Sequence, residues 1–329
     1  MEKNYYILKS GKLKRKDNTL YIINKEGRKA IPVNDVNALY LFGEIGLNTK
    51  LLTFLSQNKI TLHVFNYYGS YVGSYYPREY LNSGHVVVQQ SKHYLDNEKR
   101  IYIAKEFVDA ALHNIIRNLA YYKKHGKEVE EIIENIESEK TKIPNVENVL
   151  QLMGVEGTSR NSYYKSFDTI LRPGFKFEKR TRQPPKNMVN CLISFGNSLL
   201  YTLCLTEIYH TQLNPTISFL HEPFERRFSL ALDLAEVFKP LLIDRVIFSL
   251  INNQMIKEEH FENKLNFCYL NNSGRRLFIQ QFDEKLRTTI KHKDLKRKAS
   301  YKYLIRLECY KLIKHVLDDK QYKAFRLWW

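Results

Sequence analysis

Short apolar runs and turn-forming residues alternate along the first part of the chain, up to about residue 75. The apolar runs occupy residues 5–9, 19–25, 29–33 and 38–42, and residues 60–77 return to the same pattern. Turn-forming Gly, Asn and Asp separate them. One helical stretch interrupts the series, where Asn48 and Thr49 can cap the segment LLTFLSQNK. This pattern predicts a small β-sandwich or twisted β-domain.

From about residue 90 the periodicity becomes helical. Apolar residues recur at helical spacing, with acidic residues early and basic residues late in the longest segment. The predicted helices span 96–124, 127–142, 145–171 and 187–210. The remainder to residue 329 reads as helical and basic. We therefore expect an α+β protein, with a β-rich domain over residues 1–85 and a larger all-α domain over residues 86–329; the linking segment is residues 76–90.

The stretch 219–245, FLHEPFERRFSLALDLAEVFKPLLIDR, combines an amphipathic helix with polar side chains that could bind a cation. His221 is expected at the head of the helix. Asp233 and Glu236 lie three residues apart and so share one helical face. Each of them alone is more often a capping, core or solvated residue. Together, an imidazole and two carboxylates could hold a divalent metal.

Glu156 is a third candidate ligand, because it stands in the apolar, glycine-flanked sequence GVEG. Burying an acid there is unfavourable unless a positive charge compensates it. An exposed or capping glutamate is the alternative. Glu156, His221 and Glu236 offer oxygen and nitrogen but no thiolate, and this donor set suits Mg²⁺ or Mn²⁺ better than zinc. Such an ion can polarise a phosphoryl oxygen during attack on a phosphodiester.

The charge of the chain points to a polyanionic partner. Its 329 residues include 52 Lys and Arg against 35 Asp and Glu, which gives a formal net charge of +17. Nucleic acid is the first candidate and an anionic membrane surface the second. A general excess of lysine is the alternative. No apolar run approaches the roughly 18–20 residues of a spanning helix, and the N-terminus has no apolar signal core, so we expect a cytoplasmic protein without a membrane segment.

Basic residues are concentrated in the loop 172–186, which separates two predicted helices. Flexible cations of this kind commonly contact the phosphate backbone, although a solvated loop would look the same. The four cysteines, Cys191, Cys204, Cys268 and Cys309, are far apart in sequence and form no CxxC pair. We expect them to be buried, reduced thiols.

These motifs, taken in order, resemble the CRISPR-associated integrase of spacer acquisition, a metal-dependent nuclease family, in the version found with type I interference systems. The resemblance covers nearly the whole chain. It is carried at the N-terminus by GKLKRKDNTLYI and ITLHVFNYYGSYVGSYYPRE, and at the C-terminus by EGTSRNSYY, RTRQPPKNMVNCLISFGNSLLY and the stretch 219–245.

The resemblance implies metal ligands at Glu156, His221 and Glu236, with Asp233 as an auxiliary acid. It also implies an active-site rim that contacts DNA. With the basic residues of the loop and of the helix after His221, the expected DNA-binding set is Tyr163, Arg180, Arg182, Lys186, Asn190, Arg227 and Lys239.

The resemblance further implies a homodimer formed through the β-rich domain and a complex with a small ferredoxin-like partner subunit. Double-stranded protospacer DNA would lie on the basic surface, and each 3′-hydroxyl would attack the repeat boundary of the CRISPR array. Two alternatives stay open. One is a non-catalytic nucleic-acid-binding scaffold, whose acids merely pair with arginines such as Arg226 and Arg227. The other is a structure-specific DNA nuclease of repair.

Overall fold

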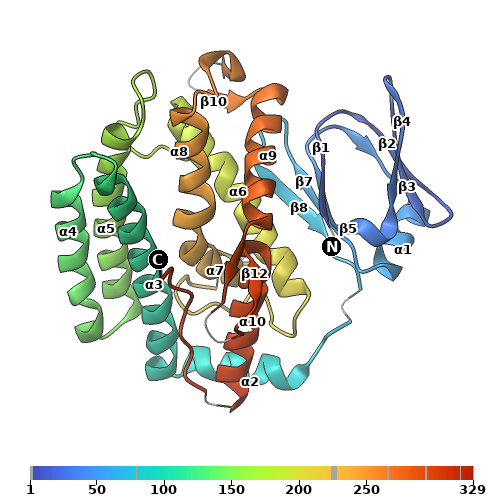
Figure 1. The fold of residues 1–329 in the computed structure, drawn as a ribbon. Helices are drawn as coiled ribbons and strands as arrows, with labels where there is room; N and C mark the ends of the chain where they lie inside the picture. Colours follow the sequence, from blue (N-terminus) through green and yellow to red (C-terminus); the bar gives the residue numbers. More distant parts are fainter. Residues whose placement is uncertain are drawn as a thin grey trace.

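A β-rich N-terminal part precedes a larger helical part in the protein, as the computed structural model in Figure 1 shows. The structure describes residues 3–78, 80–223, 228–264, 267–292, 295–318 and 320–328. The predicted α+β class is confirmed. The division into domains at residues 85 and 86 stays a prediction.

Two sheets form the β-rich part. In the first, with order β1–β5–β7–β8, β1, β5 and β7 run parallel and β8 is antiparallel to β7. In the second, with order β4–β3–β2–β6, β2, β3 and β4 form an antiparallel meander and β6 pairs parallel with β2. The strands are β1 (Lys3–Ile7), β2 (Gly11–Lys16), β3 (Thr19–Asn24), β4 (Gly27–Pro32), β5 (Val36–Leu41), β6 (Ile45–Gly46), β7 (Thr61–Phe65) and β8 (Tyr71–Tyr75).

The central strand β5 joins the two parts of the molecule because both of its faces are buried. Side chains alternate across a strand. Leu39 and Leu41 therefore enter the core of the β-rich part, whereas Ala38 and Tyr40 enter the large core of the helical part. The sheet that carries β5 is thus covered on one face by its own domain and on the other by helices.

The predicted cap of the first helix is present. Helix α1 (Thr49–Gln57) begins after Asn48, whose side-chain oxygen accepts a hydrogen bond from the Leu51 N–H at 2.9 Å. Strand β2 was not predicted, because Leu13 is the single apolar residue in GKLKRK. Leu13 is fully buried. It is the single buried residue of a strand whose other residues have the composition of a charged loop.

The helical part is built around long helices that match the predicted segments closely (Figure 1). The helices are α2 (Gly84–Leu95), α3 (Asn97–Lys124), α4 (Glu130–Thr141), α5 (Val149–Ile170), α6 (Met188–Tyr209), α7 (Ser229–Lys239), α8 (Arg245–Asn252), α9 (Asn272–Arg287) and α10 (Tyr301–Asp318). A π-helical turn, Pro240–Asp244, connects α7 to α8.

Two expectations for the helical part need correction. The expected linker, residues 76–90, is helical from Gly84 onward, because the Ser83 hydroxyl accepts from the Val86 N–H and caps α2. The part is also not entirely α, since two short antiparallel ribbons occur within it. Their strands are only three or four residues long and gave no strand pattern: β9 (Phe261–Lys264), β10 (Phe267–Leu270), β11 (Thr289–Lys291) and β12 (Lys298–Ser300).

Helix α6 lies in the centre of the core. Within the described part of the chain it alone is long and apolar enough to cross a membrane, with a mean hydropathy of 1.5, contrary to the expectation that no run approaches that length. However, 72% of its apolar window is buried inside the protein. Burial against other helices explains its composition without a bilayer.

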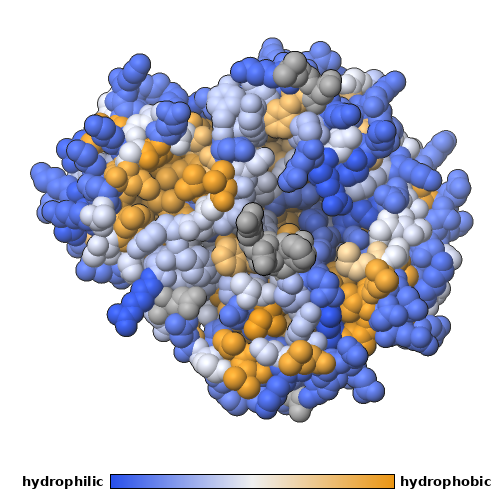
Figure 2. All heavy atoms as spheres, turned by 180° about the vertical axis from the view of Figure 1, so that it is seen from behind, coloured by the Kyte–Doolittle hydropathy of each residue, from blue (hydrophilic) through white to orange (hydrophobic). Residues whose placement is uncertain are grey.

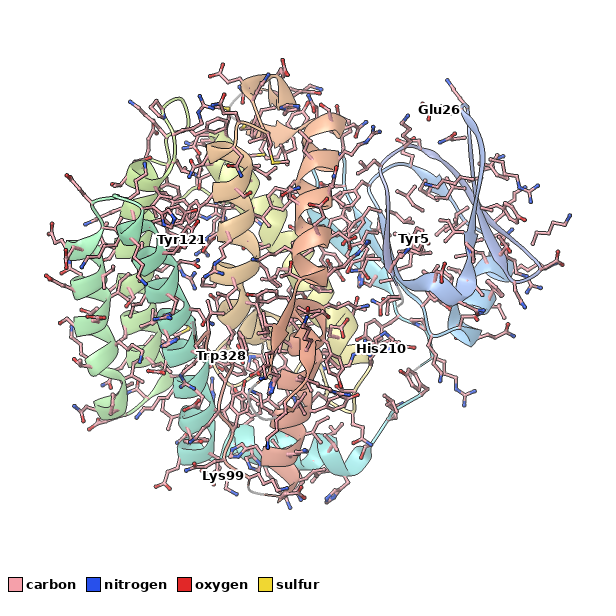
Figure 3. The ribbon with its side chains drawn as sticks, in the orientation of Figure 1. Tyr5, Glu26, Lys99, Tyr121, His210 and Trp328 are labelled. Carbon is pink, nitrogen blue, oxygen red and sulfur yellow. The ribbon has the colours of Figure 1, made fainter. Side chains whose placement is uncertain are left out.

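The C-terminal segment packs back along α3. Asn114 of α3 donates to the backbone oxygens of Val237 in α7 and Phe325 in the tail, at 3.0 and 3.1 Å. Trp328 contacts the rings of Phe325 and His292, with centroids 5.9 and 6.4 Å apart, and lies beside the lower half of the helical part in Figure 3. The tail is therefore part of the core around α7. Trp329 lies outside the described residues.

Candidate active site

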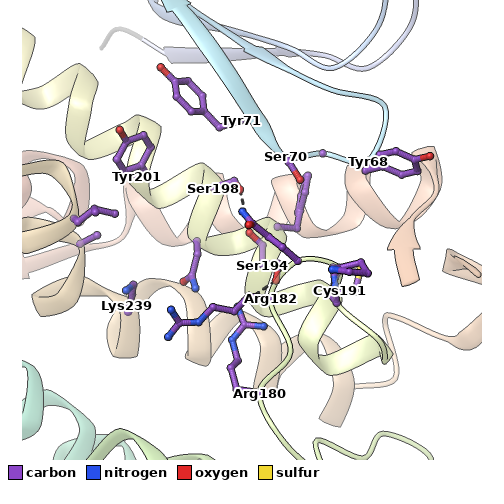
Figure 4. Close-up of a pocket in the computed structure, with 18 of the residues that line it drawn as sticks. Tyr68, Ser70, Tyr71, Arg180, Arg182, Cys191, Ser194, Ser198, Tyr201 and Lys239 are labelled. Atoms are coloured by element: carbon purple, nitrogen blue, oxygen red, sulfur yellow. Dashed lines mark hydrogen bonds between the residues drawn. The ribbon is translucent and has the colours of Figure 1, made fainter. Parts of the chain in front are cut away.

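A cleft of about 1,410 Å³ opens between α6, the turn that joins β7 to β8, and the segments that carry the candidate ligands. Figure 4 shows Arg180, Arg182 and Lys239 at this cleft, on the side opposite Ser70 and Tyr71. The turn is held close to α6 at Gly69, which has a φ of +83° and leaves no room for a Cβ against Phe195. Glu156, His221 and Glu236 all line this cleft. Residues far apart in sequence thus share one cavity.

His221 lies in the loop before α7 and not at the head of that helix, which begins at Ser229. Its imidazole donates from Nδ1 to Oδ1 of Asp233 at 2.8 Å. The backbone N–H of His221 reaches the same oxygen at 2.9 Å. This bond directs Nε2 of the ring away from Asp233 and leaves it available as a metal ligand.

Asp233 organises the loop that carries His221. Its Oδ2 accepts from the backbone N–H groups of Phe219 and Leu220 at 2.7 and 3.0 Å. The carboxylate is completely buried, so its charge is compensated by these donors and by His221. The structure places Asp233 against the His221 ring and not among the residues that line the cleft; its role as an auxiliary acid stays a prediction.

Glu156 and Glu236 meet across Arg160, which the sequence analysis missed. Arg160 donates from Nε to Glu156 Oε1 at 3.0 Å and from Nη2 to Glu236 Oε2 at 2.5 Å. Lys239 pairs with the other oxygen of Glu236. Helix α5 supplies Glu156 and Arg160, and α7 supplies Glu236 and Lys239. The two candidate ligands therefore share one guanidinium.

Electrostatics of the cluster follow from burial and close charges. Burial raises the pKa of Glu236, but Lys239, Arg160 and His221 lower it by more, to about 2. Burial lowers the pKa of His221, but Asp233 and then Glu236 raise it above the ordinary 6.5. Glu236 is therefore ionised at neutral pH, and His221 holds a proton more readily than an ordinary imidazole.

The donor chemistry fits a divalent cation. Two carboxylates and a ring nitrogen from three separate segments line the same cavity, and one cationic group already bridges the carboxylates. Their spacing is wider than that of an assembled site, since no group of three or more His, Cys, Asp or Glu in the described ranges is close enough to hold an ion. Glu156, His221 and Glu236 are the residues that would hold it.

The expected DNA-binding residues fall into two sets. Arg182 and Lys186 are exposed on the loop 172–186, and Lys239 is partly exposed; Arg182 and Lys239 line the cleft. Tyr163 is completely buried in the core and so does not face the cleft. Arg227 lies outside the described residues, as does Arg226.

Arg180 and Asn190 form hydrogen bonds that hold the loop 172–186 in place. Asn190 is fully buried and accepts from Arg180 Nη1 at 2.9 Å and from the Thr181 N–H at 3.0 Å, while its Nδ2 donates to Lys179 O at 2.8 Å. Burial lowers the pKa of Arg180. Asn190 is buried away from the cleft, whereas Arg180 is half-buried and lines the cleft while it holds the loop against α6. The sequence did not distinguish these internal contacts from a DNA-facing surface.

Asp244, like Arg160, was not predicted as a site residue from the sequence. It is 4% exposed, and burial raises its pKa to about 6, against the effect of Arg160. Signals for both missed residues exist in the sequence. Arg160 follows Glu156 at i+4, the spacing of a helical ion pair, and Asp244 is an acid within the apolar run PLLIDR.

The fold and the cleft define an α+β protein in which two glutamates and a histidine line one cavity together with basic side chains, and comparison with known proteins identifies the family. The model of the CRISPR associated protein Cas1 family matches residues 5–284. A "CRISPR-associated endonuclease Cas1 3" from Thermodesulfovibrio yellowstonii is 53% identical over 99% of this chain and 100% of its own length. The chain belongs to the Cas1 family.

Solved structures agree with this assignment. A Cas1 protein from Thermotoga maritima is 41% identical, with a TM-score of 0.89 over 98% of this chain and 100% of its own. A "Casposase bound to integration product" is 21% identical, with a TM-score of 0.89 over 98% of this chain and 92% of its own, and shares the fold. The predicted family and the predicted CRISPR-associated endonuclease are confirmed.

Proposed function

We propose that this chain is a metal-dependent DNA strand-transferase and endonuclease of CRISPR adaptation. It joins double-stranded protospacer DNA to the CRISPR array through attack of a 3′-hydroxyl on a phosphodiester. One observation carries the proposal: Glu156, His221 and Glu236 come from α5, a loop and α7 to line one cleft with basic residues at its wall.

The proposed cofactor is Mg²⁺ or Mn²⁺, held by Glu156, His221 and Glu236. Such an ion stabilises negative charge on the scissile phosphate and on the leaving oxygen. Asp233 fixes the tautomer and the orientation of His221 through the 2.8 Å hydrogen bond. Glu236, whose pKa is about 2, presents an ionised carboxylate at every physiological pH.

Basic residues at the cleft are proposed to bind the DNA backbone. Arg182 and Lys239 line the cleft and Lys186 lies exposed on the same loop. Arg227 belongs to the proposed set because of its place in the family motif. The net charge of +17 favours DNA over a neutral substrate.

The proposed assembly is a homodimer formed through the β-rich part, joined to a small ferredoxin-like partner subunit in the cytoplasm. Exposed apolar side chains support a contact there: Val64 of β7 is 36% exposed and Val72 of β8 is 63% exposed. Figure 2 shows apolar side chains gathered in a patch over the β-rich part, on the left of that view. Neither the dimer nor the partner follows from a contact within this chain.

Two other functions compete with this proposal. A non-catalytic scaffold gains support from Arg160, which neutralises two of the acids as a purely structural ion pair would. The arginines first expected in that role, Arg226 and Arg227, lie outside the described residues. A repair nuclease would use the same cleft. Dependence of the reaction on a CRISPR repeat in the target separates integration from repair.

Strand transfer into a repeat-containing plasmid, with Mn²⁺ or Mg²⁺ and the partner subunit, tests the proposal. Glu156→Ala, His221→Ala and Glu236→Ala are expected to abolish joined product, and Glu147→Gln, an exposed acid just before α5, is the control. Wild-type activity in all three alanine variants would refute the proposed ligands. Cleavage without preference for the repeat would favour the repair nuclease.

A further inference from the structure

Arg160 occupies the position between two carboxylates that a bound cation would take. It bonds Glu156 at 3.0 Å and Glu236 at 2.5 Å, and its side chain is only 12% exposed. Two acids this close repel one another unless a positive charge lies between them. Arg160 supplies that charge and ties α5 to α7.

Asp244 is a buried acid that interacts electrostatically with this ion-pair cluster. The π-helical turn Pro240–Asp244 brings it there, and π-helical turns often occur at functional sites. Its Oδ2 is buried and has no hydrogen-bond partner among the described residues. The Tyr163 hydroxyl acts on Asp244 as a hydrogen-bond donor that lowers its pKa, although neither Tyr163 Oη nor Asp244 Oδ2 has a partner within normal hydrogen-bond geometry. A buried carboxylate oxygen without a donor is unfavourable and requires an explanation.

Arg160 is the neighbour that could supply the missing donor. Of the charges acting on Asp244, that of Arg160 has the largest effect. Asp244 in turn acts on Arg160, together with Glu236 and Glu156. The guanidinium carries five N–H donors in a planar fork, so it can exchange one carboxylate for another without losing its charge.

A divalent ion would compete directly with Arg160. The ion would need oxygens of Glu156 and Glu236 that now accept from the guanidinium. A guanidinium left next to the ion would repel it and would lose its own buried partners. Metal binding therefore requires Arg160 to find another acid.

We propose that Arg160 transfers its hydrogen bonds from Glu156 and Glu236 to Asp244 when a divalent metal binds. This inference rests on the proposed metal site. Arg160 and Asp244 are then positioning residues: the first keeps the carboxylates apart and neutralised before the metal arrives, and the second holds Arg160 afterwards. The exchange makes metal affinity depend on Asp244, which is not a ligand.

Crystals of the wild-type protein grown with Mn²⁺ test the exchange directly. The expected result is anomalous density among Glu156, His221 and Glu236, with Arg160 within hydrogen-bond distance of Asp244. Mn²⁺ in place while Arg160 still bonds Glu156 and Glu236, or faces solvent, would overturn the inference and leave the metal site intact. No Mn²⁺ at these residues would overturn the proposed site, and the inference with it.

A double-mutant cycle provides an independent measure in solution. Asp244→Asn, which keeps the shape of the side chain, is expected to weaken Mn²⁺ binding about tenfold. Arg160→Gln removes the competing cation and is expected to strengthen Mn²⁺ binding. In the Arg160→Gln background, Asp244→Asn should change the affinity by less than about twofold, since its role acts through Arg160.

A purely electrostatic attraction between Asp244 and the metal predicts a different outcome for the double-mutant cycle. If Asp244 attracts the metal only as a nearby negative charge, the tenfold loss persists without Arg160, and the inference fails. Asp283→Asn, which removes another half-buried acid paired with Arg287, is the control and should leave Mn²⁺ affinity unchanged. Should Arg160→Gln fail to fold, the Mn²⁺ crystal structure decides the matter alone.

Discussion

His221 is held by Asp233 through two bonds to a single carboxylate oxygen, from its ring Nδ1 at 2.8 Å and from its backbone N–H at 2.9 Å. The side chain of a loop residue thereby gains the fixed orientation that a helix would otherwise provide. Helix α7 carries both Asp233 and Glu236. One helix therefore sets the position of two of the three proposed metal ligands.

Replacing Asp233 should affect stability and metal binding together. Asp233→Ala leaves the buried N–H groups of Phe219 and Leu220 without an acceptor, and each such loss costs about 1–3 kcal/mol. Mn²⁺ affinity should fall by roughly 10–100-fold as His221 loses its orientation. Urea unfolding and Mn²⁺ titration measure the two effects. Unchanged Mn²⁺ affinity in a folded Asp233→Ala variant would contradict the proposed role of Asp233 in orienting His221 as a ligand.

Mn²⁺ binding should weaken as the pH falls. A proton and a metal compete for His221, and the pKa of His221 is raised above 6.5 by Asp233 and Glu236 against the effect of burial. Affinity is therefore complete above the raised pKa and declines below it. Asp233→Asn removes the strongest raising influence and should move the decline to lower pH. A midpoint that does not move would contradict this assignment.

The stability that the His221–Asp233 pair contributes to the metal-free protein should decrease as the pH rises, whereas Mn²⁺ affinity increases. A histidine whose folded pKa lies above its unfolded value contributes stability below the unfolded pKa, and that contribution is lost as the pH rises through the folded pKa. The His221 contribution is thus full below about pH 6.5 and disappears in the range above it. Thermal unfolding of wild-type protein and His221→Asn across this range measures the difference, which should shrink as the pH rises.

Arg182 should contribute to DNA affinity through charge. It is exposed and lines the cleft, so Arg182→Ala should weaken binding to all DNA sequences similarly. The slope of log affinity against log salt should fall in magnitude by about 0.7–0.9 for one lost phosphate contact. Lys176→Ala, an exposed cation on the same loop outside the cleft lining, is the control. Equal effects of the two substitutions would indicate only a general charge effect.

Replacing Asn190 should lower the stability of the protein, because the side chain is buried and holds the loop 172–186. Asn190→Ala removes the bonds to Lys179, Arg180 and Thr181 that hold the loop to α6. The free energy of unfolding should fall by about 2–4 kcal/mol, since several buried groups lose partners. Asn197→Ala, which changes a residue of the cleft lining, is the comparison. Full stability in Asn190→Ala together with weaker DNA binding would restore Asn190 to the DNA-facing set.

The sequence predicted most elements of the fold because their signals are local. Helix α1 has its Asn48 cap, and the long helices have sustained periodicity. The elements it missed lack such signals. Strand β2 depends on the burial of Leu13 alone, and β9 and β11 are short and largely polar. Their conformation is decided by pairing with a neighbouring strand, β2 with β3, β9 with β10 and β11 with β12, and the periodicity of one short segment cannot reveal such pairing.

The site was predicted in the same uneven way. Residue types and family motifs pointed to Glu156, His221 and Glu236, and all three line the cleft. Arg160 was missed because an i+4 ion pair is common on ordinary helix surfaces. Asn190 and Tyr163 were expected at the DNA surface from the family resemblance, but both are buried. Their burial depends on how α5 and α6 pack, which the sequence does not reveal. Which face of a helix meets its neighbours is a tertiary property.

Direct Mn²⁺ titration, followed by electron paramagnetic resonance, tests the central claim most directly. The wild-type protein should bind one Mn²⁺ ion at the site of Glu156, His221 and Glu236 with an affinity that Glu236→Gln and Glu156→Gln each reduce by at least about tenfold. Glu147→Gln should bind Mn²⁺ as the wild type does. Equal Mn²⁺ binding by the wild type and both ligand variants would contradict the account.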